Sequence, residues 1–244
     1  MARSSDERRG SARLKHLAWN AVRTLTTPLL PDDYLDLVDP LRSPRYLRAR
    51  VVDVHPETAD AATVTLQPGL GWAGHVPGQF IRVGVDVDGV RLWRAYSVTS
   101  GPRDDGRITI TVKSLSGGLV SSHLHESLRS GQIVHLEQAS GEFVWTGGVE
   151  PTLYVTGGSG ITPVMGMLRN HDFDGLDVVL AHSAPTADDV IFARELAAAP
   201  TGVRAIVRHT DDEGMLTPDQ LDEVVPDWRE RETWICGPTP MLDA

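Results

Sequence analysis

The stretch from about residue 46 to 139 alternates apolar and polar residues in short runs, which turn sequences such as GLGWAG, DG and GPRDDG separate. Alternation of this kind predicts β-strands with one buried face. Between the fifth and sixth run, the segment GGLVSSHLHESLRSG spaces its leucines for one short helix. Six short strands with one interposed helix predict a closed antiparallel barrel. The expected strands are 46–54, 61–68, 78–87, 90–98, 106–114 and 132–139.

The pattern changes at Pro151, where short apolar runs begin to alternate with segments of helical spacing. Strands that alternate with helices predict parallel βαβ units, hence a doubly wound parallel sheet. The expected strands are 152–157, 176–184, 203–210 and 233–237, and the expected helices are 162–170, 190–199 and 217–225. The sequence ends at PTPMLDA, where a further helix would begin, so we expect it to be the front part of a longer protein.

We therefore divide the chain into an N-terminal basic arm with a Pro-rich strap (1–46), an antiparallel β-barrel (47–148) and an α/β domain (149–244). In the arm, Leu14, Leu17, Ala18 and Val22 have helical spacing. Two interpretations stay open: an arm packed on its own body, which we favour, or a basic amphipathic helix at a membrane surface or partner.

Charge, apolar runs and cysteine content argue against several classes of partner and site. The net charge of −10 argues against nucleic acid as a partner. The N-terminus lacks the apolar segment of a secretory signal, and no apolar run approaches the roughly 20 residues that span a bilayer, so we expect a cytoplasmic protein, peripheral to the membrane at most. The single cysteine, Cys236, excludes an internal disulfide and any four-cysteine metal site. His123 and His125 stand two residues apart, so they point to different helix faces, and we expect no metal site.

The segment GGSGITPVMGMLR follows a predicted strand and opens a predicted helix. Glycines in that setting let the backbone approach a ligand, and the helix N-terminus favours a phosphate group. Pro163 stands where the dinucleotide fingerprint of dehydrogenases has its third glycine, which disfavours a plain Rossmann dehydrogenase. The last predicted strand ends in CGPTPM, and ligands of open α/β sheets bind at strand C-terminal ends. Cys236 and Gly237 should therefore face the same crevice as Gly158.

The segment RLWRAYSVTS places Arg94, Tyr96 and Ser97 close together at the end of a strand. Alone, this pattern indicates no more than an edge strand with an exposed ion pair. Taken in order, however, RAYS, GGLVSSHLH, GGSGITPVM and CGPTPML resemble the ferredoxin–NADP reductase superfamily, above all the reductase portion of flavohaemoglobins and of oxygenase or desaturase reductases. The resemblance covers residues 46–244. The arm resembles actinobacterial reductases in which a [2Fe-2S] ferredoxin domain follows the nucleotide domain.

The resemblance implies that the barrel binds FAD and the α/β domain binds NADPH or NADH. Tyr96 would stack on the isoalloxazine, Ser97 would bond near N5, and Arg94 would neutralise a phosphate. Tyr96, Ser97 and Cys236 would flank the transfer as catalytic positioners. The expected cofactor-binding residues are Arg94, Tyr96, Ser97, Val98, Lys113, Gly117, Gly118, Leu119, Val120, Ser121, Gly158, Gly160, Thr162, Pro163, His182, Ser183, Arg208, Cys236, Gly237, Pro238 and Met241.

The function that the resemblance implies is hydride transfer from NADPH to FAD N5. Single electrons would then pass to a [2Fe-2S] centre absent from this chain, which feeds an oxygenase or a membrane lipid desaturase. We expect NADPH rather than NADH because no acidic residue ends the second α/β strand, where one would repel a 2′-phosphate. Ser183 could bind that phosphate, although Ala184 stands where many NADPH-using relatives carry arginine, and Arg208 could compensate. The alternatives are a free-standing NAD(P)H:flavin or quinone reductase and a non-catalytic flavin relay subunit docked through the arm.

Overall fold

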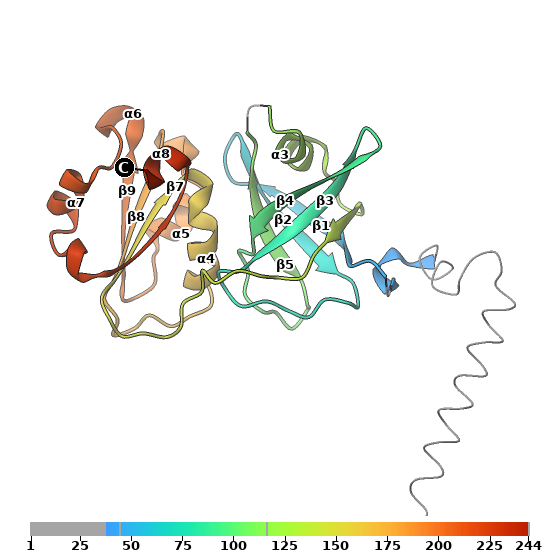
Figure 1. The fold of residues 1–244 in the computed structure, drawn as a ribbon, viewed down its shortest axis with the longest axis horizontal. Helices are drawn as coiled ribbons and strands as arrows, with labels where there is room; N and C mark the ends of the chain where they lie inside the picture. Colours follow the sequence, from blue (N-terminus) through green and yellow to red (C-terminus); the bar gives the residue numbers. More distant parts are fainter. Residues whose placement is uncertain (1–37, 44, 116, 244) are drawn as a thin grey trace, which may run out of the picture.

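The computed structural model describes residues 38–43, 45–115 and 117–243, which fold into a barrel and an α/β unit packed side by side (Figure 1). The amphipathic helix predicted around residues 14–22 lies outside the described residues. In the part of the chain that the structure describes, no helix has the length and apolar character to cross a bilayer.

The barrel is a six-stranded antiparallel sheet in the order β4-β3-β6-β1-β2-β5. An isolated bridge between Val98 and Ile110 brings the end of β4 to β5, so the two outer strands meet and the sheet closes. Buried valine, isoleucine and leucine side chains fill the interior. The predicted barrel is confirmed. The strands are β1 (Arg48–Pro56), β2 (Ala61–Pro68), β3 (Phe80–Val87), β4 (Val90–Ser97), β5 (Ile108–Lys113) and β6 (Ile133–Leu136).

A two-residue turn sets the register of the strand that carries the RAYS motif. Asp88 and Gly89 both have positive φ, 50° and 79°, as a type I′ hairpin turn requires. Val87 therefore pairs with Val90, and the ladder continues through Ile81 with Tyr96 to Phe80 with Ser97. The DG dipeptide thus fixes which residues of β4 lie at its far end. The predicted helix is also present, as α3 (Leu119–Ser122) continuing into the π-helical turn η2 (His123–Ser127).

The α/β unit is a parallel sheet in the order β10-β7-β8-β9. Its two central strands are buried along their whole length because both faces are covered. Residues of α4 and α5 pack on one face, and residues of α7 pack on the other, so the doubly wound fold is confirmed. The strands are β7 (Thr152–Gly157), β8 (Val178–Ala184), β9 (Val203–His209) and β10 (Glu232–Cys236).

Short helices make up the remaining elements. The α-helices are α4 (Thr162–Leu168), α5 (Ala193–Ala197), α6 (Thr210–Glu213), α7 (Pro218–Val224) and α8 (Thr239–Leu242). The 3-10 turns are η1 (Pro40–Arg42), η3 (Gly158–Ile161), η4 (Ala187–Asp189) and η5 (Trp228–Glu230).

Helix α4 lies between the two units (Figure 1). All seven of its residues are buried, because the helix packs on the parallel sheet on one side and on the barrel on the other. Gly166 packs closely on the barrel, because an added Cβ would lie 2.5 Å from the backbone oxygen of Val98. A side chain of any size would push the two units apart.

The segment that joins the units is anchored at both ends. At the barrel end, Phe80 and Ser140 exchange two backbone hydrogen bonds of 2.9 Å. At the other end, Phe143 meets Trp234 edge to face with ring centroids 5.0 Å apart, and Trp145 lies 5.1 Å from Phe173. These aromatic contacts tie the connection to the α/β core.

We expect Gly166→Ala to destabilise the protein. In an open helix this change gains about 1 kcal/mol from helix propensity, but here the methyl group overlaps the Val98 carbonyl, and overpacking costs about 1–3 kcal/mol. Urea unfolding should show a net loss of free energy of unfolding. Gly148→Ala is the control, because nothing lies within 4 Å of its added Cβ. A stabilised Gly166→Ala protein would contradict the close packing of α4.

Candidate active site

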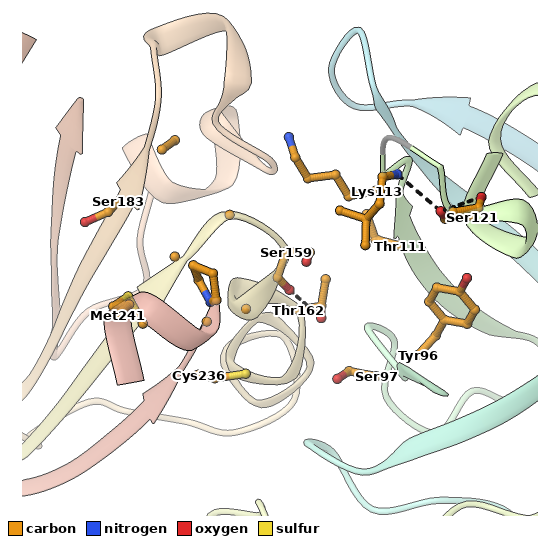
Figure 2. A pocket seen from close by; sticks show the side chains of 18 of the residues that line it. Tyr96, Ser97, Thr111, Lys113, Ser121, Ser159, Thr162, Ser183, Cys236 and Met241 are labelled. Carbon is orange, nitrogen blue, oxygen red and sulfur yellow. Dashed lines mark hydrogen bonds between the residues drawn. The ribbon is translucent and has the colours of Figure 1, made fainter. Parts of the chain in front are cut away.

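A cavity of about 860 Å³ lies between the barrel and the α/β unit, a volume at the upper end of those of small-molecule sites. The barrel contributes β4, the end of β5 and the segment that leads into α3. The α/β unit contributes the C-terminal ends of β7, β8 and β10, where open parallel sheets bind ligands. Figure 2 shows Ser97 and Tyr96 on one wall, opposite Cys236 and Thr162 on the other.

On the barrel wall, β4 supplies a cation, an aromatic ring and a hydroxyl. The Arg94 guanidinium is exposed and donates through Nη1 to the Trp93 oxygen at 2.8 Å. Tyr96 is half-buried, and burial raises the pKa of its hydroxyl to about 12, against the opposing charge of Arg94. The Tyr96 hydroxyl therefore stays protonated over the physiological range and offers a neutral, flat face.

The segment that leads into α3 is held by its own hydrogen bonds. Ser121 Oγ accepts from the Leu115 amide at 3.2 Å and donates to the Gly118 oxygen at 3.1 Å, so its hydroxyl shapes this loop (Figure 2). Gly117 has a φ of +76°, and nothing lies within 4 Å of the place where a Cβ would stand. A ligand can therefore approach the backbone closely at Gly117.

Lys113 lines the cavity but its charge is already paired. Its Nζ lies 2.7 Å from Asp60 Oδ2. Partial burial works to raise the pKa of the Asp60 carboxyl, but hydrogen bonds from Lys113 and Thr58 outweigh it and hold that pKa below its usual range. The ion pair ties β5 to the β1–β2 turn and leaves Arg94 as the more available cation on this wall.

On the α/β wall, the last two glycines of GGSG, Gly158 and Gly160, have different roles. Gly158 has a φ of +52° with open space at its Cβ position, so its backbone faces the cavity freely. Gly160 packs against backbone instead, because an added Cβ would lie 2.0 Å from the Cys236 oxygen. Thr162 Oγ1 donates to the Ser159 oxygen at 2.9 Å and closes the turn. Gly160 is thus a packing glycine that brings β10 against the turn.

Cys236 ends β10 with its sulfur directed toward Ser97 (Figure 2). Burial raises the pKa of its thiol, so the thiol is protonated at neutral pH and is a poor nucleophile. A positioning contact suits this residue better than covalent chemistry. Gly237, Pro238 and Met241 follow it on the same wall. The described residues contain no group of three or more His, Cys, Asp or Glu arranged to hold a metal ion.

Five of the predicted binding residues do not line the cavity. Val98 is buried in the barrel core and Pro163 is buried in α4, while Leu119 points outward with 64% of its surface exposed. His182 is buried within β8, with 1% of its surface exposed. Arg208 donates to the Gly214 oxygen at 2.8 Å and to the Glu213 oxygen. The remaining predicted residues all line the cavity.

Sequence reasoning missed several lining residues. Ser159 lies inside the GGSG motif and could have been included on that ground. Leu115 and Met215 are exposed apolar residues from opposite walls, and no motif marks either of them. The other lining residues that were missed are Ala95, Thr111, Gly157, Ala184, Pro185 and Thr210.

Comparison with known proteins shows similarity to FAD-binding and NADPH-dependent oxidoreductases. The oxidoreductase FAD-binding domain family matches residues 53–145. An NADPH oxidoreductase of Mycobacterium tuberculosis is 46% identical over 243 residues, covering 94% of this chain and 64% of that protein. The glycine betaine monooxygenase reductase subunit of Chromohalobacter salexigens is 36% identical over 215 residues, covering 80% of this chain and 58% of that protein. The chain thus spans about three fifths of the length of these relatives.

The FAD/NAD-binding domain of a nitric oxide dioxygenase from Vibrio cholerae has the same fold. Its TM-score is 0.64 at 23% identity, covering 79% of this chain and 99% of that one. A barrel packed on a parallel sheet is thus the fold that the two proteins share. Residues 53–145 therefore belong to the oxidoreductase FAD-binding domain family, and the chain is similar to ferredoxin–NADP reductase-like oxidoreductases. The resemblance found in the sequence is confirmed.

His182 makes the stability of the protein dependent on pH. Its Nδ1 lies 2.9 Å from Thr156 Oγ1, and burial lowers its pKa from 6.5 to about 4. The unfolded chain therefore binds the proton more tightly than the folded one. The contribution of neutral His182 is complete above about pH 6.5 and is lost as the pH falls toward 4.

We expect the free energy of unfolding to drop by about 2 kcal/mol between about pH 7.5 and 5 because of this residue. His182→Asn keeps a polar partner for Thr156 and should flatten that part of the profile. The measurement is urea unfolding at both pH values, with His55→Asn, at an exposed position, as the control. An unchanged pH slope in His182→Asn would contradict the buried neutral imidazole.

Proposed function

We propose that the chain is the NADPH:FAD half of a reductase that passes electrons singly to an iron–sulfur centre serving an oxygenase or lipid desaturase. The observation that carries the proposal is the meeting of two half-sites on one cavity. Tyr96 and Ser97 face it from the barrel, and Cys236 and Thr162 face it from the α/β unit. Two cofactors that must touch each other need such an arrangement.

The barrel wall suits FAD in shape and charge. Gly117 has open space where a Cβ would stand, so a phosphate group could approach its backbone. Arg94 offers an exposed guanidinium with donors to spare, and a bidentate phosphate contact is what this group does best. Tyr96 offers a neutral ring for stacking. Ser97, one residue further on, would direct its hydroxyl at the reacting edge of the flavin.

The α/β wall suits a dinucleotide. Gly158 opens the backbone toward the cavity at the start of a helical segment, where amide groups lack internal partners. At the end of β8, the buried Ser183 hydroxyl has no hydrogen-bond partner among the described residues. Cys236 would contact the nicotinamide end.

When both cofactors are bound, they would supply the chemistry, which is hydride transfer from the nicotinamide to flavin N5, while Tyr96, Ser97 and Cys236 would hold their reacting ends. The chain's own residues bind, orient and exclude water. The protonated thiol of Cys236 and the neutral hydroxyl of Tyr96 add no competing base or nucleophile at the point of transfer.

The electron acceptor is proposed from the relatives and the composition. One of the similar proteins is a monooxygenase reductase subunit. With a single cysteine in 244 residues, this sequence cannot ligate a cluster that needs four. We therefore infer that a [2Fe-2S] centre of a further domain or a separate protein takes the electrons. A free-standing flavin or quinone reductase would differ in reducing its acceptor without any iron–sulfur protein.

The test is an anaerobic absorption spectrum of the FAD-loaded chain before and after addition of NADPH, then of NADH. We expect the flavin band to bleach, faster with NADPH. A flavin that stays oxidised with both nucleotides would contradict the hydride-transfer function, and failure to bind FAD would contradict the assignment of the barrel wall.

A pair of β4 variants tests the same assignment at one residue. Arg94→Met should weaken FAD binding by about 10- to 100-fold, because a charged hydrogen bond contributes about 1.5–3 kcal/mol. Arg91→Met is the matched control, since Arg91 lies on the same strand but pairs with Asp86 at 2.9 Å and does not line the cavity. Its FAD affinity should change by less than about two-fold.

The nucleotide preference provides a further prediction. Arg208 is the cation that could reach a 2′-phosphate at the end of β9, but it lies 3.6 Å from the Glu213 carboxylate. Glu213→Gln keeps the acceptor for the His209 amide and removes the competing charge. We expect the ratio of kcat/KM for NADPH over NADH to rise by up to about tenfold. Asp212→Asn, in the same helix, is the control, and an unchanged ratio in Glu213→Gln would exclude Arg208 from phosphate binding.

A further inference from the structure

An arginine directly after α4 joins the α/β unit to the barrel. Arg169 Nη1 donates to the Thr99 backbone oxygen, in the barrel, at 2.8 Å. Its Nε and Nη2 donate to the two carboxylate oxygens of Glu195, in α5, at 2.8 and 2.5 Å. The planar guanidinium thus links the end of α4 to α5 and to the barrel segment at Thr99. A lysine ammonium lacks this planar set of donors.

Phe192, a residue with a strained backbone, packs its ring against the Arg169 guanidinium. Phe192 has φ 61° and ψ 29°, a left-handed conformation that costs a bulky residue about 1–2 kcal/mol. Its buried ring lies under the guanidinium, with Arg169 Cζ 4.6 Å from the ring centroid. The same turn starts α5, so that Glu195 follows three residues later and reaches Arg169. The strain therefore places both the ring and the carboxylate.

The barrel segment that Arg169 grips continues directly from Ser97. It is fixed from the barrel side as well, because the Thr99 amide donates to the Thr109 oxygen at 2.8 Å, and the Ser100 oxygen accepts from His75 Nε2 at 2.8 Å. At Gly101 an added Cβ would overlap the Asn170 side chain. We call the hydrogen bond from Arg169 to Thr99 the clamp. Because this segment is held at Thr99, its position also determines the position of Ser97, two residues earlier.

The other end of α4 faces the cavity. Thr162 begins the helix and lines the cavity together with Gly158 and Gly160, and Arg169 follows the last residue about 10 Å away along the axis. We propose that Arg169 is a positioning residue that locks α4 to the segment after β4. It thereby sets the distance at which Thr162 and Cys236 face Tyr96 and Ser97. This inference rests on the proposed function.

Single-turnover kinetics test the positional role. In Arg169→Met, the anaerobic rate of flavin reduction by saturating NADPH should fall at least about tenfold, because a misplacement of about 1 Å can cost 100-fold. The Kd values for FAD and for NADP⁺ should stay within about three-fold, since Arg169 does not line the cavity. Arg169→Lys should lie between the two. A rate within about two-fold of the unchanged protein, or a loss explained by weaker nucleotide binding, would overturn the proposal.

Arg231 provides the control for loss of an arginine ion pair. It lies 2.9 Å from Asp177 and 2.8 Å from Asp227, and both partners belong to the α/β unit. We expect Arg231→Met to lower the Tm at least as much as Arg169→Met but to leave the rate per folded molecule unchanged. If both variants slow reduction equally, Arg169 contributes stability alone and the proposal fails.

A distance measurement without cofactors separates this proposal from the proposed function. In a Cys236→Ser background, spin labels at Val90→Cys in the barrel and Glu223→Cys in α7 report the separation of the two units by pulsed EPR. We expect one narrow distance distribution, and a broader or shifted one after Arg169→Met. An identical distribution in both proteins would contradict the clamp. If NADPH does not reduce the bound FAD at all, the proposed function is wrong. The EPR result still shows whether Arg169 holds the two units together.

Discussion

The structure depends on the close packing of α4 against the barrel. The helix presents a glycine, Gly166, to the backbone oxygen of Val98, where even a methyl group would not fit. Because one end of α4 carries the Gly158–Thr162 turn and the other meets Thr99, this contact relates the two halves of the cavity. Neither half could bring two cofactors together alone, so the interface is part of the site rather than a mere connection between domains.

The cavity is a place for orientation more than for acid–base chemistry. The Lys113 charge is paired with Asp60, the Cys236 thiol is held protonated by burial, and the His182 imidazole is neutral and buried away from the cavity. What remains for a ligand are open backbone at glycines, one exposed guanidinium and neutral polar groups. Such a lining suits a transfer whose reactive atoms belong to bound cofactors.

The sequence predicted the fold well because local signals agreed with it. The DG turn determined the register of β4, and alternating strands and helices determined the parallel sheet. Motif residues such as Ser97 and Cys236 reach the cavity because strand ends place them there. Contacts made across the fold were not predictable. Gly160 has a packing role because β10 lies directly against it. Leu115 and Met215 line the cavity only because the two units come together. Arg208 also looked free in the sequence, since its partner Glu213 comes from the next turn.

The most direct test of the central claim is a crystal structure of the chain grown with FAD and NADP⁺. We expect the isoalloxazine to lie against Tyr96 with its N5 edge near Ser97, and the dinucleotide to lie along the Gly158 turn with its nicotinamide end toward Cys236. Flavin density on any other surface, or a dinucleotide lying against Tyr96 with no flavin present, would contradict the assignment of the two walls of the cavity.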